Sequence, residues 1–181
     1  MKIEGTSLLD LKLISPDIYD DERGYFFESY KTPLFKEYGL PYDFPQDNEV
    51  KSKKGVLRGL HYQLLNPQGK LIRVVSGAIF DVAVDVRKGS PNFGCYESKI
   101  LTSENKKMLY VPEGFAHGYL VLSDEAIVTY KCTDIYYPDD QHGILWNDPD
   151  IGIDWNNDNP ILSQKDQILP ILSKQTYLPE F

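Results

Sequence analysis

One short stretch of the sequence places three basic side chains in otherwise apolar, strand-forming surroundings. Arg58 and His61 lie within residues 56–63, and Lys70 follows Gly69. Histidine takes up and releases protons near neutral pH. Arginine offers a planar fork that suits phosphate, and lysine supplies a point charge for a developing oxyanion. The stretch therefore predicts a pocket with a general base, an anion clamp and a group that stabilises an enolate.

The same residues also have a purely structural interpretation, because a lone histidine in a strand is most often a hydrogen-bonded core residue. Three buried cations in one sheet are costly without an anion, which favours the functional interpretation. Arg58 and His61 have opposite parity, so a regular strand would point them to opposite faces. A β-bulge at Gly59 would bring both side chains inward.

Tyr130 and Asp166 are further candidates, each with two interpretations. Tyr130 lies on an apolar strand face, where it is either a core residue or a proton donor whose neighbours lower its pKa. Asp166 follows Ser163 by three positions, which fits a helix cap. Alternatively, Asp166 orients His61 as a carboxylate does in a catalytic triad. Asp81 is a competing partner, and the sequence leaves this choice open.

A metal site is the main alternative use of the histidines. His117 lies beside glycine-rich turns, but the chain has only three histidines and His61 has no His-x-His partner. No carboxylate stands at a ligand spacing, so the sequence argues against a metal. Arg23, before an aromatic run, is either a plain strand start or part of an arm that reaches a nucleotide diphosphate.

Composition limits the class of protein. The 181 residues suffice for one domain with a substantial core. The net charge of -8 argues against nucleic acid or an anionic membrane as partner, although local cations can still bind an anionic substrate. Cys95 and Cys132 are isolated, and the sequence shows neither a signal peptide nor an apolar run of membrane-span length. We expect a reduced, cytoplasmic protein.

Short strands separated by turn residues dominate the predicted secondary structure. They are expected at residues 69–75, 78–86, 95–102, 107–111, 117–122 and 126–135. Thr32 is expected to cap a short helix with Pro33 at its first position and Gly39 at its end, and a second short helix is expected to open at Ser163. This pattern predicts an antiparallel sandwich or a small barrel.

Ten short motifs, taken in order, resemble the dTDP-4-dehydrorhamnose 3,5-epimerase family over roughly residues 20–170. They are DERG (21–24), QDN (46–48), VLRGLHYQ (56–63), GKL (69–71), DVAVDVR (81–87), SPNFG (90–94), GFAHG (114–118), YK (130–131), WND (146–148) and LSQKD (162–166). Each motif alone is weak, but their common order is specific.

The resemblance implies a mainly β fold, a cupin-type antiparallel jelly roll with a few short helices. Residues 1–181 would form one domain, with an N-terminal arm exchanged in a homodimer and a short helical C-terminal segment. The implied enzyme converts dTDP-4-dehydro-6-deoxyglucose to dTDP-4-dehydro-L-rhamnose for dTDP-rhamnose biosynthesis. It would remove protons beside the C4 ketone, at C3 and C5, and return them on the opposite face without a metal or organic cofactor.

The resemblance also assigns roles to single residues. His61 matches the base, Tyr130 the opposite-face acid, Lys70 the group near the enolate oxygen and Asp166 the partner of the histidine. The positions that match substrate contacts are Arg23, Glu28, Gln46, Asn48, Arg58, His117 and Lys165.

Three residues depart from the family pattern and leave the substrate open. Glu49 and Val50 stand where the family often has a small polar or histidine-serine pair, and Gln141 stands where many members have glutamate. A single-carbon epimerase acting at C3 or C5, or an enzyme for a CDP-linked sugar, is therefore the alternative. A non-catalytic cupin is disfavoured by the presence of the base, acid and lysine, and a metal-dependent cupin by the missing ligand pattern.

Overall fold

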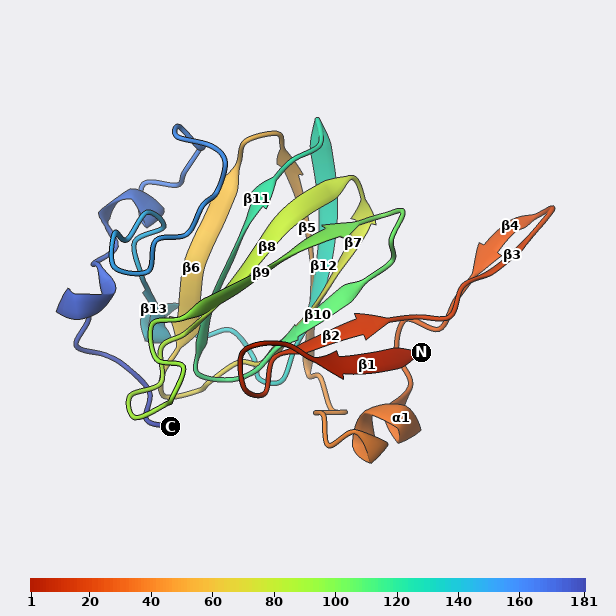
Figure 1. Cartoon of the computed structure of the whole chain (residues 1–181), viewed down its shortest axis with the longest axis horizontal. Coiled ribbons are helices and arrows are strands. Elements are labelled where there is room, and N and C mark those ends of the chain that lie inside the picture. The colour runs from red at the N-terminus through yellow and green to blue at the C-terminus, as the bar shows by residue number, and fades with distance from the viewer.

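The computed structural model describes residues 1–181, and its strands form two facing antiparallel sheets and a separate two-stranded hairpin (Figure 1). In spatial order, one sheet contains β1 (Lys2–Gly5), β2 (Lys12–Ser15), β10 (Met108–Val111), β7 (Lys70–Ser76), β12 (Glu125–Cys132) and β5 (Gln46–Lys53). The other contains β13 (Gln141–Gly143), β6 (Leu57–Gln63), β11 (Phe115–Val121), β8 (Ala78–Asp85) and β9 (Tyr96–Thr102). This sandwich confirms the predicted mainly β, antiparallel fold class.

Apolar clusters lie between the two sheets and over parts of their outer faces. Between the sheets lies a cluster that includes Ile72, Ile79 and Leu109. On the outer face of the five-stranded sheet, Val82 and Val84 belong to a second cluster, together with Trp155 from the C-terminal segment. A third cluster joins helix α1 (Thr32–Glu37) to the outer face of the six-stranded sheet through residues such as Phe35 and Ile14. Burial on both sides explains why strands such as β8 are apolar almost throughout.

Both predicted helices differ in detail from the expectation. Helix α1 begins at Thr32 with Lys31 as its N-cap, and no side chain caps it, so the predicted Thr32 cap is wrong. The Thr32 hydroxyl instead donates to the hydroxyl of Tyr30 at 3.0 Å. At Ser163 the predicted helix is reduced to a single 3₁₀ turn, Asp166–Ile168. Two other 3₁₀ turns span Pro138–Asp140 and Leu172–Lys174. None of the helices is long and apolar enough to cross a membrane.

A hairpin of β3 (Tyr19–Asp21) and β4 (Gly24–Phe26) extends away from the two sheets (Figure 1). Tyr19, Tyr25 and Phe26 are exposed on it. An isolated two-stranded hairpin is marginally stable in water, and adjacent exposed aromatic rings mark an interaction surface. The hairpin therefore has the character of an arm.

Strand β6 carries one more residue than its neighbour β11. His61 pairs with His117, whereas Arg58 pairs with Tyr119, so three steps along β6 match two along β11. This irregularity confirms the bulge predicted at Gly59. It also removes the parity problem, because Arg58 and His61 line the same pocket.

Two glycines permit the close approach of the strands at this bulge. Gly59 has a φ of +122°, and a Cβ atom there would lie 2.6 Å from the Cα atom of Gly118. A Cβ atom on Gly118 would lie 2.7 Å from the carbonyl oxygen of Arg58. Side chains larger than hydrogen do not fit at either position without moving the backbone.

We therefore expect Gly118→Ala to lower the free energy of unfolding by about 1–3 kcal/mol, the usual effect of overpacking a rigid site. Gly5→Ala is the matched control, because the nearest atom to a Cβ there is Lys12 Nζ at 4.0 Å. Its effect should stay within about 0.5 kcal/mol. Urea unfolding of both variants measures the difference, and equal stabilities would contradict the tight contact.

Candidate active site

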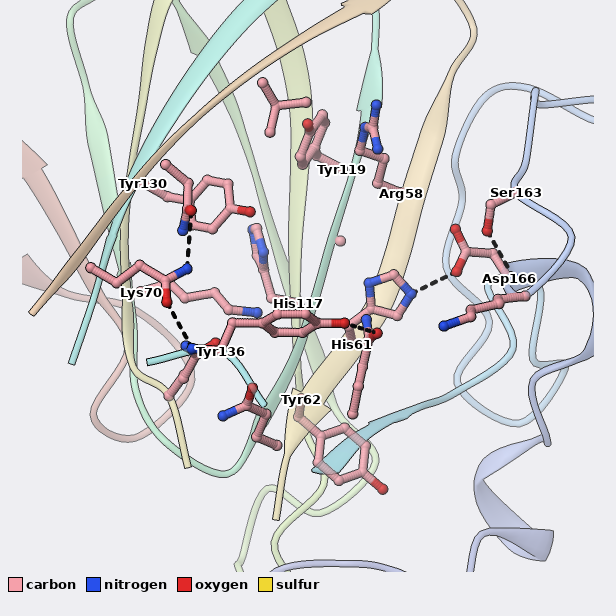
Figure 2. Close-up of a pocket in the computed structure, with 18 residues that line it drawn as sticks. Arg58, His61, Tyr62, Lys70, His117, Tyr119, Tyr130, Tyr136, Ser163 and Asp166 are labelled. Carbon is pink, nitrogen blue, oxygen red and sulfur yellow. Dashed lines mark hydrogen bonds and ion pairs between the residues drawn. The ribbon is translucent and has the colours of Figure 1, made fainter. Parts of the chain in front are cut away.

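A pocket of ≈ 370 Å³ opens between the two sheets and is lined by side chains of β5, β6, β7, β11, β12 and the segment 163–166 (Figure 2). This volume lies within the range of small-molecule sites. Of the predicted site residues, the pocket gathers His61, Lys70, Tyr130, Asp166, Gln46, Asn48, Arg58, His117 and Lys165.

The structure does not bring Arg23 and Glu28 to this pocket. Arg23 lies on the hairpin arm, where it is exposed and forms an ion pair with Asp21. Glu28 accepts a hydrogen bond from the ammonium of Lys31 at 3.0 Å. Within a single chain, Arg23 and Glu28 therefore do not reach a ligand bound in this pocket.

His61 is held by Asp166. Its Nε2 atom lies 2.6 Å from Asp166 Oδ1, so Nδ1 is left facing the pocket (Figure 2). The Ser163 hydroxyl accepts the backbone N–H of Asp166 at 3.1 Å, so the capping and orienting interpretations hold together. Burial by itself would raise the pKa of Asp166, but the hydrogen bond and charge of His61 outweigh it and hold the pKa below its usual value. The carboxylate is thus kept ionised behind the imidazole.

Asp81, the competing partner, binds the other pocket histidine. Its two carboxylate oxygens each lie 3.0 Å from Nε2 of His117. Both side chains are buried, His117 to 8% and Asp81 to 0% exposure. The choice that the sequence left open is therefore resolved by two separate histidine–carboxylate pairs.

Lys70 lies at the start of β7 and points into the pocket (Figure 2). Burial lowers the pKa of its ammonium group, and the Cys132 thiol and Asp81 partly oppose this effect. An ammonium group that has lost part of its hydration gains more from a nearby oxyanion than one in water does. Lys70 is thus suited to stabilise negative charge on a bound ligand.

The pocket is cationic although the chain carries a net charge of -8. Arg58, Lys70 and Lys165 all line it, whereas its carboxylates at Asp166 and, beneath it, Asp81 are each engaged by a histidine. An excess of positive charge in a concave site favours an anionic ligand such as a phosphate ester.

Tyr130 lies across the pocket from His61, with its hydroxyl toward the interior (Figure 2). The expectation that its neighbours lower its pKa is wrong: burial raises the pKa, and Arg58 only partly counteracts this. The phenol therefore keeps its proton at neutral pH and is a donor in the resting state.

Several lining residues were not predicted as site residues, among them Tyr62, Gln63, Gln68, Tyr119 and Tyr136. Tyr119 could have been found, since it lies two positions after His117 on one strand and so shares its face. The sequence around Tyr136 has no comparable spacing from a predicted site residue on the same strand. Its hydroxyl donates to Oε1 of Gln141 at 2.7 Å across a turn whose path the sequence does not reveal.

Two of the three departures from the family pattern lie at the pocket. Val50 and Gln141 line it, and Glu49 does not. The side chain of Glu49 is exposed on β5, the edge strand of the six-stranded sheet. Only Val50 and Gln141 are therefore in a position to alter contacts with a ligand.

Comparison with known proteins agrees with the resemblance over nearly the whole chain. The sequence profile described as dTDP-4-dehydrorhamnose 3,5-epimerase matches residues 5–174. The dTDP-4-dehydrorhamnose 3,5-epimerase of Methanothermobacter thermautotrophicus is 54% identical over 165 residues, which cover 90% of this chain and 89% of the relative.

Solved structures give the same result. The dTDP-6-deoxy-D-glucose-3,5-epimerase of Legionella pneumophila, in complex with dTDP-4-keto-L-rhamnose, is similar with a TM-score of 0.96 at 46% identity, over 99% of this chain and 98% of that chain. ChmJ, a 3'-monoepimerase from Streptomyces bikiniensis in complex with dTDP-quinovose, is similar with a TM-score of 0.91 at 34% identity, over 97% and 91%. The sequence and the structure together show that the chain belongs to the dTDP-4-dehydrorhamnose 3,5-epimerase family.

Proposed function

We propose that this protein is an isomerase that converts dTDP-4-dehydro-6-deoxyglucose to dTDP-4-dehydro-L-rhamnose, for dTDP-rhamnose biosynthesis. One observation carries the proposal. A base supported by a carboxylate, His61 with Asp166, and a protonated phenol, Tyr130, lie on opposite sides of a cationic pocket. Relatives named as 3,5-epimerases, one of them in complex with a dTDP-linked keto sugar, support it independently.

The chemistry follows from the positions of these groups. A C4 ketone acidifies the neighbouring carbons, so Nδ1 of His61 removes a proton from C3 or C5 and the electron pair moves onto the ketone oxygen. Lys70 stabilises the resulting enolate, and Asp166 stabilises the imidazolium ion. Tyr130 then donates its proton to the opposite face of the carbon, which inverts that centre. Before the next carbon reacts, His61 releases its proton to solvent and Tyr130 takes one up. The ketone itself accepts the electron pair, so the route requires neither a metal nor an organic cofactor.

Incubation with the 4-keto sugar nucleotide in deuterated water is the direct test. NMR reports which carbons gain deuterium and which invert. Exchange and inversion at both C3 and C5 support the proposal, and inversion at one carbon alone would identify a monoepimerase. The same assay with the CDP-linked sugar tests the choice of nucleotide.

Cys95 and Cys132 are both free thiols, which supports a cytoplasmic location for this reaction.

Replacing the base should abolish both exchange and inversion. We expect His61→Asn to lower turnover by about 10²–10⁴-fold, because positioned acid–base catalysis contributes that much. The amide of asparagine retains a polar group opposite Asp166 but cannot accept the proton at neutral pH. Near-normal deuterium incorporation in this variant would remove His61 from the mechanism.

Replacing the acid should separate exchange from inversion. Tyr130→Phe keeps the ring on its strand but removes the proton donor, so His61 should still exchange deuterium on the original face while few carbons invert. Mass spectrometry of the substrate measures exchange, and NMR of the product measures inversion. If Tyr130→Phe inverts both carbons at nearly the normal rate, Tyr130 is a core residue and another group supplies the proton.

We also propose that residues 1–181 form one domain that acts as a homodimer, with the hairpin arm reaching the second copy. The exposed aromatic residues on the arm support this assembly, because contact with another chain would cover them. Arg23 and Glu28 lie outside their own pocket but match substrate-contacting positions of the family. If the arm places Arg23 and Glu28 at the pocket of the second copy, they can contact substrate there although they lie outside their own pocket.

Complementation tests this assembly. Arg23→Ala and His61→Asn should each be poorly active alone, but a refolded mixture should regain activity. In a mixed dimer, one pocket has its own His61 and receives Arg23 from the partner chain. Random pairing of symmetric dimers then restores about a quarter of the sites. Absence of any gain in the mixture, with dimers present by light scattering, would show that Arg23 does not act on the partner's pocket.

A further inference from the structure

Tyr119 has a buried hydroxyl group with no partner in the protein. The residue lies on β11, lines the pocket and is only 4% exposed. It is the one buried side chain whose polar atom makes no hydrogen bond. Leaving a buried hydroxyl unpaired is unfavourable, so such a group calls for an explanation.

The surroundings of this hydroxyl are those of an anion site. Tyr119 pairs with Arg58 across the bulge, and Figure 2 shows the ring beside the guanidinium group. The nearby Ser52 oxygen accepts the Nε–H of Arg58 at 3.1 Å, which fixes the guanidinium and leaves its terminal nitrogens free. Two unengaged donors, the phenol and the fork of the arginine, thus stand together at this part of the pocket.

The phenol is a donor under working conditions. Burial raises the pKa of Tyr119 to about 12, although Arg58 and Ser52 act in the opposite direction. At neutral pH the group therefore keeps its proton. A neutral O–H beside a guanidinium group suits an anionic oxygen, because both then donate to the same acceptor.

We propose that Tyr119 is a substrate-positioning residue whose hydroxyl, together with Arg58, donates to a non-bridging oxygen of the substrate's diphosphate. The inference rests on the proposed function, which supplies a ligand with such a group. It adds a contact that His61, Lys70 and Tyr130 do not make, since these three act on the sugar.

The test compares wild type with Tyr119→Phe in three measurements. The affinity for dTDP, measured by calorimetry, should fall about tenfold, the factor expected for one hydrogen bond to a charged group. The affinity for the full 4-keto sugar nucleotide should fall by the same factor. In turnover, KM should rise while kcat stays nearly constant, because the bond is made equally in the ground and transition states.

Stability provides a readout that distinguishes binding from a structural role. The Tyr119 hydroxyl makes no hydrogen bond of normal geometry, even to the nearby Ser52, so the Tm of free Tyr119→Phe should be unchanged or higher. Tyr110→Phe is the matched control, since Tyr110 is also a buried strand residue but donates to Glu113 at 3.3 Å, away from the pocket. This control should lower Tm and leave dTDP affinity unchanged.

Three outcomes would overturn the inference: unchanged dTDP affinity in Tyr119→Phe, a loss confined to the sugar nucleotide, or a drop in Tm as large as that of Tyr110→Phe. The second outcome would place the contact on the sugar. Failure of the proposed function is separately visible, because wild type would then bind dTDP without exchanging deuterium into the keto sugar.

Discussion

The contact between the backbones of β6 and β11 determines what faces the pocket. Side chains alternate along a strand, so residues three apart normally point to opposite sides of a sheet. The extra residue in β6, accommodated where Gly59 meets Gly118, changes this relation for Arg58 and His61. It also sets His61 directly opposite His117. Arg58 and His61 thereby belong to one pocket instead of to two faces of a sheet.

The two carboxylates at the pocket, Asp81 and Asp166, are each paired with a histidine. Burying a carboxylate is unfavourable unless hydrogen bonds compensate for lost hydration, and Asp81 and Asp166 each find a histidine. Because these carboxylates bind histidines, they do not form ion pairs with Arg58, Lys70 and Lys165, and the pocket keeps its positive charge. The remaining acidic residues, which give the chain its net charge, lie elsewhere. A strongly acidic protein can in this way keep a basic interior cavity.

The sequence predicted well what depends on local pattern. Six strands were placed to within three residues of their observed limits, because apolar runs and turn residues mark them directly. Strand β5 was not predicted, since an edge strand of mostly polar residues has no apolar run. Residue patterns alone left the partner of His61 open, whereas the resemblance to the family pointed to Asp166, as the structure shows. Asp81 and Asp166 are equivalent in sequence, and only the path of the chain after β13 decides between them.

That path makes the orientation of His61 depend on a contact with Asp166 across 105 residues of chain. From β13 to the C-terminus the backbone forms no further strand, and side chains such as Trp155 and Leu172 hold it against the five-stranded sheet. Segments with few ladder hydrogen bonds detach at a lower free energy than the body of a protein unfolds. The imidazole then loses its carboxylate while the sandwich stays intact. Inactivation by heat or denaturant should accordingly precede global melting, with amide protons after residue 143 exchanging before those of the central strands.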